Sequence, residues 1–159
     1  GPRKTSMIQR FFKDVYWGKK DFLIVDTPPG TSDEHLAIAA SLNPTLNSES
    51  GDGVVLVSTP QELCRVTVAK QINFCRKSSL PLIGLIENMA YFQCPCCEEK
   101  TPIFGKPQIN AASLGKEYDI PILGSLPFDP TLCKGTDTGD VIPLKVLDDI
   151  SIALVKSTR

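Results

Sequence analysis

The chain has no hydrophobic run long enough to cross a bilayer, because proline, glycine or charge soon interrupts each apolar stretch and a membrane-spanning helix needs roughly 20 apolar residues. It also has no excess of one charge: 17 Lys and Arg stand against 18 Asp and Glu, which gives a formal net charge of -1. No basic patch of the kind that binds nucleic acid stands out. These absences predict a soluble protein with no membrane and no nucleic-acid partner.

Histidine and phosphate-binding glycines are also scarce. His35 is the only histidine, and we predict that it packs or faces solvent in the first turn of a helix rather than acting in catalysis. No glycine-rich loop with Lys and Ser or Thr occurs, since the segment 135–139 lacks the lysine and follows no predicted strand. The chain by itself is therefore predicted not to anchor the β and γ phosphates of a nucleotide and not to hydrolyse ATP.

Cysteine, in contrast, is plentiful, with six residues in the chain. The first nine residues carry neither the apolar core of a signal peptide nor the Arg-rich amphipathic pattern of a transit peptide. We therefore predict a reducing compartment, by default the cytoplasm, where clustered cysteines indicate metal or redox chemistry more often than structural disulfides.

The hydrophobic pattern predicts alternating strands and helices. Four runs rich in Val, Ile and Leu without polar alternation are typical of parallel strands covered on both faces: 22–25, 53–57, 82–86 and 122–126. Helical spacing predicts helices around 7–15, 59–74, 111–118 and 144–155. We predict one α/β domain over residues 1–159, with an open, mostly parallel sheet flanked by helices. The loops 43–52 and 88–107 interrupt the rhythm, and the second is long enough to indicate a function.

The first predicted strand is followed by an unusual turn. Asp26 ends the apolar run, two prolines follow it, and Gly30 comes next. Ligands of open α/β sheets bind beyond the carboxyl ends of the strands, so an acid at this place can hold Mg²⁺ through water. Gly30 would let a bare amide approach a terminal phosphate. The same residues also occur in ordinary turns.

The loop 88–107 contains the string Cys94-Pro95-Cys96-Cys97. Thiolates three residues apart can share one metal ion or cluster, but one pair supplies only two of four ligands. The remaining ligands could come from elsewhere in the chain or from the same pair in a second subunit. We predict that the three outlying cysteines pack in the core as small hydrophobic residues: Cys64, Cys75 and Cys133.

Three interpretations of the cysteine loop compete. A zinc ribbon needs a second close cysteine pair, which the chain lacks. A glutaredoxin-like redox motif also has Cys-Pro-x-Cys, but it belongs at a helix N-terminus early in a thioredoxin-type fold. A cluster shared across a two-fold axis is the third interpretation.

Two strings give the sequence a family resemblance. The segment 23–33 resembles the switch region of the deviant Walker A P-loop ATPases. Its Pro-Pro-Gly-Thr form is similar to that of the Mrp (ApbC) iron-sulfur cluster carriers, and its continuation 31–36 resembles their eukaryotic cytosolic scaffold branch. In these carriers a Cys-Pro-x-Cys pair follows an Ile-Glu-Asn-Met strand end, as residues 86–89 precede the cysteines here.

The resemblance implies roles for individual residues. Cys94 and Cys97 would hold half of a bridging [4Fe-4S] cluster, while Cys96 stands at the variable position and makes the choice of ligand less definite. In the complete protein, Asp26 would tune Mg²⁺ and Gly30 would sense the γ-phosphate of ATP. Asn88, by itself a common turn residue, would bind adenine, with Pro127 beside the base.

The resemblance also implies an overall role. The chain would be the C-terminal part of a P-loop ATPase-like domain that carries clusters in the cytoplasm. It would act as a homodimer, or as a heterodimer with a related scaffold ATPase, and serve apo iron-sulfur proteins. The phosphate-binding strand lies in the middle of the sheet in this family, so its absence should leave an apolar edge exposed and the chain poorly stable unless that edge is covered. The alternative is a non-enzymatic metal- or cluster-binding module without nucleotide chemistry.

Overall fold

The computed structural model describes residues 2–46, 51–104, 110–140 and 145–157. Within these ranges the chain forms six helices and four strands in the following order: α1 (Pro2–Asp14), α2 (Asp33–Leu42), β1 (Val54–Ser58), α3 (Glu62–Lys77), β2 (Leu82–Gln93), β3 (Lys100–Thr101), α4 (Ala111–Tyr118), β4 (Ile122–Pro127), α5 (Pro130–Thr138) and α6 (Lys145–Ser157). From β1 to α5 strands and helices alternate, except that β3 directly follows β2. This order confirms the predicted α/β class.

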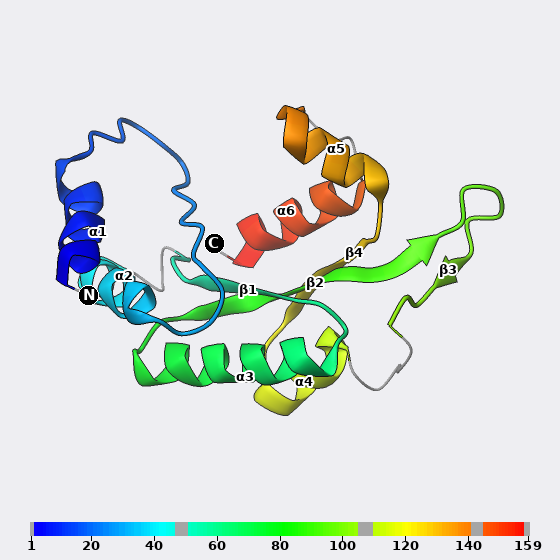
Figure 1. The fold of residues 1–159 in the computed structure, drawn as a ribbon, viewed down its shortest axis with the longest axis horizontal. Helices are drawn as coiled ribbons and strands as arrows, with labels where there is room; N and C mark the ends of the chain where they lie inside the picture. The colour runs from blue at the N-terminus through cyan, green and yellow to red at the C-terminus, as the bar shows by residue number, and fades with distance from the viewer. Residues whose placement is uncertain (1, 47–50, 105–109, 141–144, 158–159) are drawn as a thin grey trace.

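The sheet is built on β2, which pairs in parallel with β1 on one side and with β4 on the other. The short strand β3 folds back on the far end of β2 in antiparallel register. The resulting hairpin of β2 and β3 extends beyond the rest of the sheet (Figure 1). The sheet is therefore open and mostly parallel, as the sequence predicts, with an antiparallel extension that the sequence does not predict.

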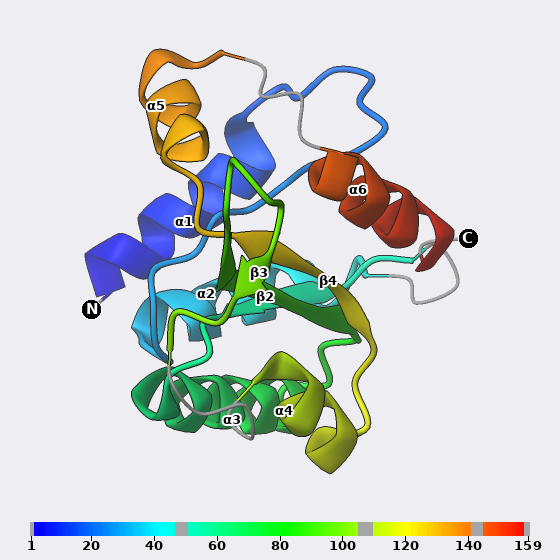
Figure 2. The same cartoon turned by 90° about the vertical axis from the view of Figure 1, so that its right-hand side faces the viewer.

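Helices cover both faces of this sheet (Figure 2). α3 and α4 lie on one face, and α6 packs against β4 on the other. The core between the sheet and the α3–α4 layer consists of apolar side chains from four elements and from the connection between α4 and β4: Leu56, Val68, Ile72, Leu85, Ala111, Leu114 and Ile120. Continuous apolar runs in β1 and β2 supply this core because a parallel strand presents side chains to two covered layers.

Two predicted segments fold differently from expectation. Residues 22–25 form no strand, although they carry the same apolar pattern as β1 and β2. A strand needs a neighbour for its backbone groups, and in the described part of the chain these residues pair with none. The predicted loop 88–107 is instead an extended hairpin as far as Thr101, because its two arms satisfy each other's backbone groups.

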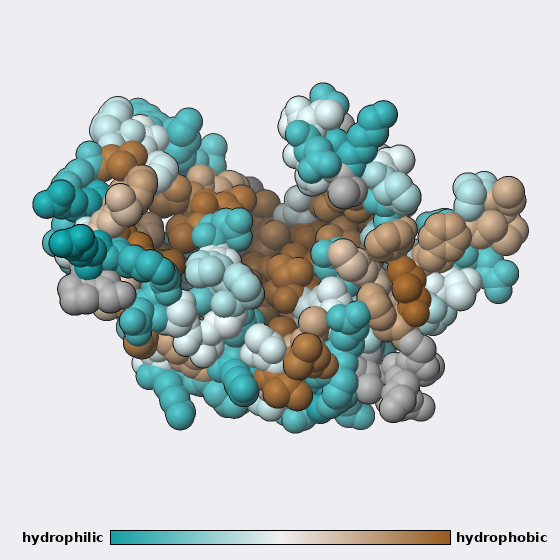
Figure 3. Space-filling model, in the orientation of Figure 1, coloured by the Kyte–Doolittle hydropathy of each residue, from teal (hydrophilic) through white to brown (hydrophobic). Residues whose placement is uncertain are grey.

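The N-terminal region leaves apolar surface uncovered. The sheet order places β1 at an edge of the described sheet, and the side chain of Ile24 in the nearby linker is 89% exposed. Figure 3 shows brown, apolar surface in the hollow between the N-terminal helices and the sheet. Apolar side chains at β1 and in the linker are thus exposed in the described part of the chain, whereas the edge and the low stability that the resemblance implies stay predictions.

Candidate functional site

The cysteine string forms the tip of the β2–β3 hairpin. Phe92 pairs with Thr101 and Gln93 with Lys100. The register continues past the strand ends, because the Cys94 amide donates to the Glu99 carbonyl at 2.9 Å. Cys94 is partly exposed, and both Cys96 and Cys97 are exposed. The hairpin therefore presents its thiols to the outside of the molecule.

Backbone groups of the tip favour the thiolate form of Cys94. The amides of Cys97 and then Cys96 donate toward its sulfur, and this lowers the pKa of the Cys94 thiol below its ordinary value. A thiolate is the form that binds metal. The turn therefore favours the form of Cys94 that could bind a metal.

The thiols of one tip do not complete a metal site. Among the described residues, no three side chains of His, Cys, Asp or Glu come together in a way that could hold a metal ion. Cys94 and Cys97 of one hairpin would supply two thiolates, which is part of the donor set of a metal ion or cluster. Their role as ligands stays a prediction.

The outlying cysteines follow the prediction in part. Cys75 is buried in α3, and burial raises the pKa of its thiol, which confirms a packing role. Cys64 is only half-buried, and its sulfur lies 3.6 Å from Oε1 of Gln61. The side chain of Cys133 lies outside the described residues.

A buried carboxylate that the sequence analysis missed supports the base of the hairpin. Oε1 of Glu87 in β2 accepts a 2.6 Å hydrogen bond from the backbone amide of Ala111, the first residue of α4. Its Oε2 lies 3.4 Å from the Ser125 hydroxyl in β4. Glu87 therefore ties together the strand that leads to the cysteines and the helix to which the chain returns. In the sequence, the signal for this role was an acidic residue, Glu87, within an otherwise apolar run.

Asn88 lies midway along β2, and Pro127 ends the adjacent strand β4. Asn88 follows Glu87 in β2, and its Oδ1 accepts a 2.9 Å hydrogen bond from the Met89 amide. Pro127, which is buried, ends β4 and pairs with Tyr91 of β2. The structure thus brings both predicted nucleotide-binding residues to the base of the cysteine hairpin, while their contact with a base stays a prediction.

Asp26 and Gly30 lie elsewhere. The expectation that Asp26 ends a strand is wrong for this structure, because residues 22–25 are not in the sheet; its side chain is exposed on the linker between α1 and α2. Gly30 has φ +93°, a conformation that favours glycine, and its carbonyl accepts from Nε2 of Gln71 in α3 at 3.3 Å. The structure does not join these two residues to the Asn88 region, and their predicted roles stay predictions.

His35 has a structural role, as predicted. Its Nδ1 accepts a 3.1 Å hydrogen bond from the Ser32 amide at the start of α2. Its ring meets that of Phe74 edge-on, with 6.1 Å between centroids. The ring thereby caps one helix and contacts another.

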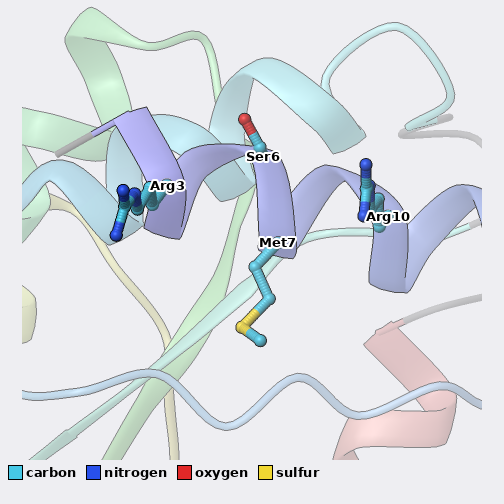
Figure 4. A pocket seen from close by; sticks show the side chains of 4 residues that line it. All are labelled: Arg3, Ser6, Met7 and Arg10. Atoms are coloured by element: carbon cyan, nitrogen blue, oxygen red, sulfur yellow. The ribbon is translucent and has the colours of Figure 1, made fainter.

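A pocket of about 420 Å³ lies on the N-terminal helix, away from these residues. Figure 4 shows its lining, which comes entirely from α1: Arg3, Ser6, Met7 and Arg10. Nothing from the cysteine hairpin contributes to it. In the described part of the chain, no helix combines the length and apolar character that crossing a membrane requires.

Comparison with models of protein families shows to which family the chain belongs. The model of the ParA family, described as NUBPL iron-transfer P-loop NTPase, matches residues 1–156. The chain belongs to this family. The resemblance of the segments 23–33 and 86–97 to iron-sulfur cluster carriers is therefore confirmed at the level of the family.

Curated relatives within the ParA/NUBPL family are similar over most of the chain. The cytosolic Fe-S cluster assembly factor CFD1 of Candida glabrata is 52% identical over 130 residues, which are 82% of this chain and 44% of that protein. The cytosolic Fe-S cluster assembly factor Nubp1 homolog of Drosophila ananassae is 46% identical over 142 residues, 89% of this chain and 46% of that protein. The chain thus spans less than half the length of these relatives.

A solved structure of the same kind agrees with the fold. A nucleotide-binding protein of Archaeoglobus fulgidus, solved in complex with ADP, superposes with a TM-score of 0.70 at 38% identity. The match covers 85% of this chain and 52% of that one. The chain therefore has the α/β fold of a P-loop NTPase over most of its length.

Proposed function

We propose that the protein is a scaffold that assembles iron-sulfur clusters in the cytosol and passes them to apo iron-sulfur proteins. The observation that carries this proposal is the hairpin tip, where backbone amides stabilise the thiolate of Cys94 beside Cys97. Relatives named cytosolic Fe-S cluster assembly factors support both the role and the compartment. The cluster is the cargo that this scaffold passes on.

The cargo is proposed to be a [4Fe-4S] cluster shared between two subunits. Such a cluster takes about four thiolate ligands, and Cys94 with Cys97 would supply two of them. A two-fold axis through the cluster makes each subunit contribute the same pair. A like copy gives a homodimer, and a related scaffold ATPase gives a heterodimer.

Nucleotide is proposed to act at the base of the same hairpin. Asn88 can both donate to and accept from an adenine edge, and Pro127 lies on the neighbouring strand. In the complete protein, Asp26 would act on Mg²⁺ and Gly30 near the γ-phosphate. ATP supplies the energy for the cycle, and β2, which contains Asn88 and leads directly to Cys94, is the physical connection between nucleotide and cargo.

Anaerobic reconstitution with iron and sulfide tests the proposed cargo. We expect visible charge-transfer absorbance and about four irons per two chains. Cys94→Ala and Cys97→Ala should each abolish iron uptake, because a missing thiolate leaves the shared site incomplete. Cys75→Ala is the matched control, since that thiol is buried in α3, and it should bind iron as the wild type does. A colourless wild-type protein with stoichiometric zinc would contradict the proposal.

A further inference from the structure

The turn that carries Gly30 has a backbone amide that no described residue occupies. Pro28 and Pro29 have no amide hydrogen, so the amide of Gly30 is the first donor after them. Among the described residues it forms no hydrogen bond. A Cβ atom built on Gly30 would meet nothing within 4 Å, so the space beside the turn is open. The amide is therefore free to donate to a ligand.

His35 holds the carboxyl end of the same turn. Its Nδ1 accepts the Ser32 amide at 3.1 Å and lies 3.2 Å from the Ser32 hydroxyl. A ring nitrogen that accepts an amide carries no proton, so in the neutral ring the proton is on Nε2. That nitrogen is buried and has no hydrogen-bond partner in the described part of the chain. Within the described residues, the hydrogen bonds of the ring therefore go to Ser32 alone.

The helix α3 contacts both ends of the turn. Nε2 of Gln71 donates to the Gly30 carbonyl at 3.3 Å. Three residues later, the ring of Phe74 meets the ring of His35 edge-on, with 79° between their planes. Residues three positions apart lie on the same face of a helix. One face of α3 thus supports both Gly30 and the ring that holds Ser32.

Gly30 needs such restraints if its amide is to point in one direction. Its φ is +93°, and glycine adopts positive and negative φ about equally readily. Because each peptide unit is planar, the bonds to the Gly30 carbonyl and from the Ser32 amide fix the two peptide units that follow Gly30. The two prolines before it restrict the backbone on the other side. Together these contacts hold the Gly30 amide in place.

We propose that His35 and Gln71 are positioning residues that direct the Gly30 amide to the terminal phosphate of ATP. The inference rests on the proposed function, in which Gly30 lies near the γ-phosphate. A helix cap would explain the contact between His35 and Ser32, but it would not explain why α3 also bonds to Gly30. Neither His35 nor Gln71 belongs to the core between the sheet and the α3–α4 layer, so their contacts serve the turn.

Nucleotide binding by the complete protein tests this inference. In His35→Leu the Ser32 amide loses its acceptor, while leucine suits a helix and can keep an apolar contact with Phe74. We expect the affinity for adenylyl imidodiphosphate, an ATP analogue that is not hydrolysed, to fall about tenfold, as for a lost hydrogen bond to a charged group. The affinity for ADP should stay unchanged because ADP lacks the γ-phosphate. Isothermal titration calorimetry in the presence of Mg²⁺ measures both affinities.

Further variants separate positioning from general damage to the fold. His35→Gln should restore the affinity for the analogue, because glutamine three residues after the N-cap accepts the same amide in a capping box. Gln71→Met keeps the length of the side chain but loses the donor, so it should weaken binding of the analogue alone. Lys70→Met is the matched control, since Lys70 is exposed beside Gln71 on α3, and it should leave both affinities unchanged.

The ratio of the affinities for the analogue and for ADP decides the outcome. An unchanged ratio in His35→Leu and Gln71→Met, whether both affinities stay or fall together, would overturn the inference. Iron uptake by the wild type tests the proposed cargo separately, so failure of the cargo would leave this measurement intact. If the wild type binds neither nucleotide, the proposed role of Gly30 fails and the inference fails with it.

Discussion

Cys94 combines partial exposure with a lowered thiol pKa. The amides of Cys97 and Cys96 lower the pKa of its thiol, whereas burial raises the pKa of Cys75. The difference arises from geometry, since a tight turn directs N–H groups at one sulfur and an apolar helix face removes water from the other. In the metal-free protein, Cys94 should therefore react with alkylating reagents faster than Cys75.

Alkylation of the metal-free protein checks this pKa direction. The rate of Cys94 modification by iodoacetamide, followed by peptide mass spectrometry across a pH series, should reach half its maximum below the midpoint of free cysteine. The lowered pKa keeps the reactive thiolate present at lower pH, and Cys75 should stay unmodified in the folded chain. A Cys94 midpoint at or above that of free cysteine would contradict the geometry of the turn.

Glu87 is the residue on which the base of the hairpin depends. Replacement by alanine leaves the Ala111 amide without its 2.6 Å acceptor and should lower the free energy of unfolding by about 1–3 kcal/mol. Glu87→Gln keeps an oxygen acceptor and should lose less. Urea denaturation of the two variants measures the difference. Equal losses of stability in the two variants would show that the hydrogen bond from the Ala111 amide is not what Glu87 contributes.

At the scale of elements, α6 is positioned by close contact with β4. A Cβ atom at Gly124 would lie 2.4 Å from Cγ1 of Ile150, which is buried in α6. Gly124→Ala should therefore destabilise the fold by about 1–3 kcal/mol through overpacking.

A double-mutant cycle tests the cause. In the Ile150→Ala background the clashing atoms are gone, so adding Gly124→Ala should cost almost nothing. Denaturant unfolding of the four proteins gives the coupling. If Gly124→Ala destabilises the Ile150→Ala protein as much as the wild type, Gly124 is required for its backbone conformation rather than for the close approach of α6.

The ion pair of Lys4 and Glu34 joins α1 to α2 at 2.7 Å. The hydrogen bond from Lys4 lowers the pKa of Glu34 from 4.5 to about 2. Because the folded-state pKa is depressed, the pair stabilises the docking of α1 fully above pH 4.5, and this contribution is lost as the pH falls toward 2.

Carboxyl NMR titration of Glu34 measures this pKa directly. In Lys4→Ala the midpoint should rise from about 2 toward 4.5, since the main cause of the shift is removed. Arg10→Ala, on the same helix, is the control and should leave the midpoint in place. A low Glu34 midpoint that persists in Lys4→Ala would contradict the docking of the two helices.

At the scale of the whole molecule, the local sequence pattern predicted those features that depend on neighbouring residues in the chain. The apolar runs of β1, β2 and β4 predicted the parallel sheet, and the Cys94 string predicted the candidate site. The run 22–25 has the same composition but forms no strand, because pairing depends on a distant neighbour. The hydrogen bond from the Ala111 amide to the Glu87 carboxylate joins residues 24 positions apart, so no local pattern could have revealed it.

The central claim is that two copies of the hairpin hold one iron-sulfur cluster. Native mass spectrometry of the anaerobically reconstituted wild-type protein tests it most directly, because mass reports subunits and cargo together. We predict a species of two chains carrying one [4Fe-4S] cluster, absent from Cys94→Ala and Cys97→Ala. A single chain holding one zinc ion, or a dimer that forms without iron and sulfide, would contradict it.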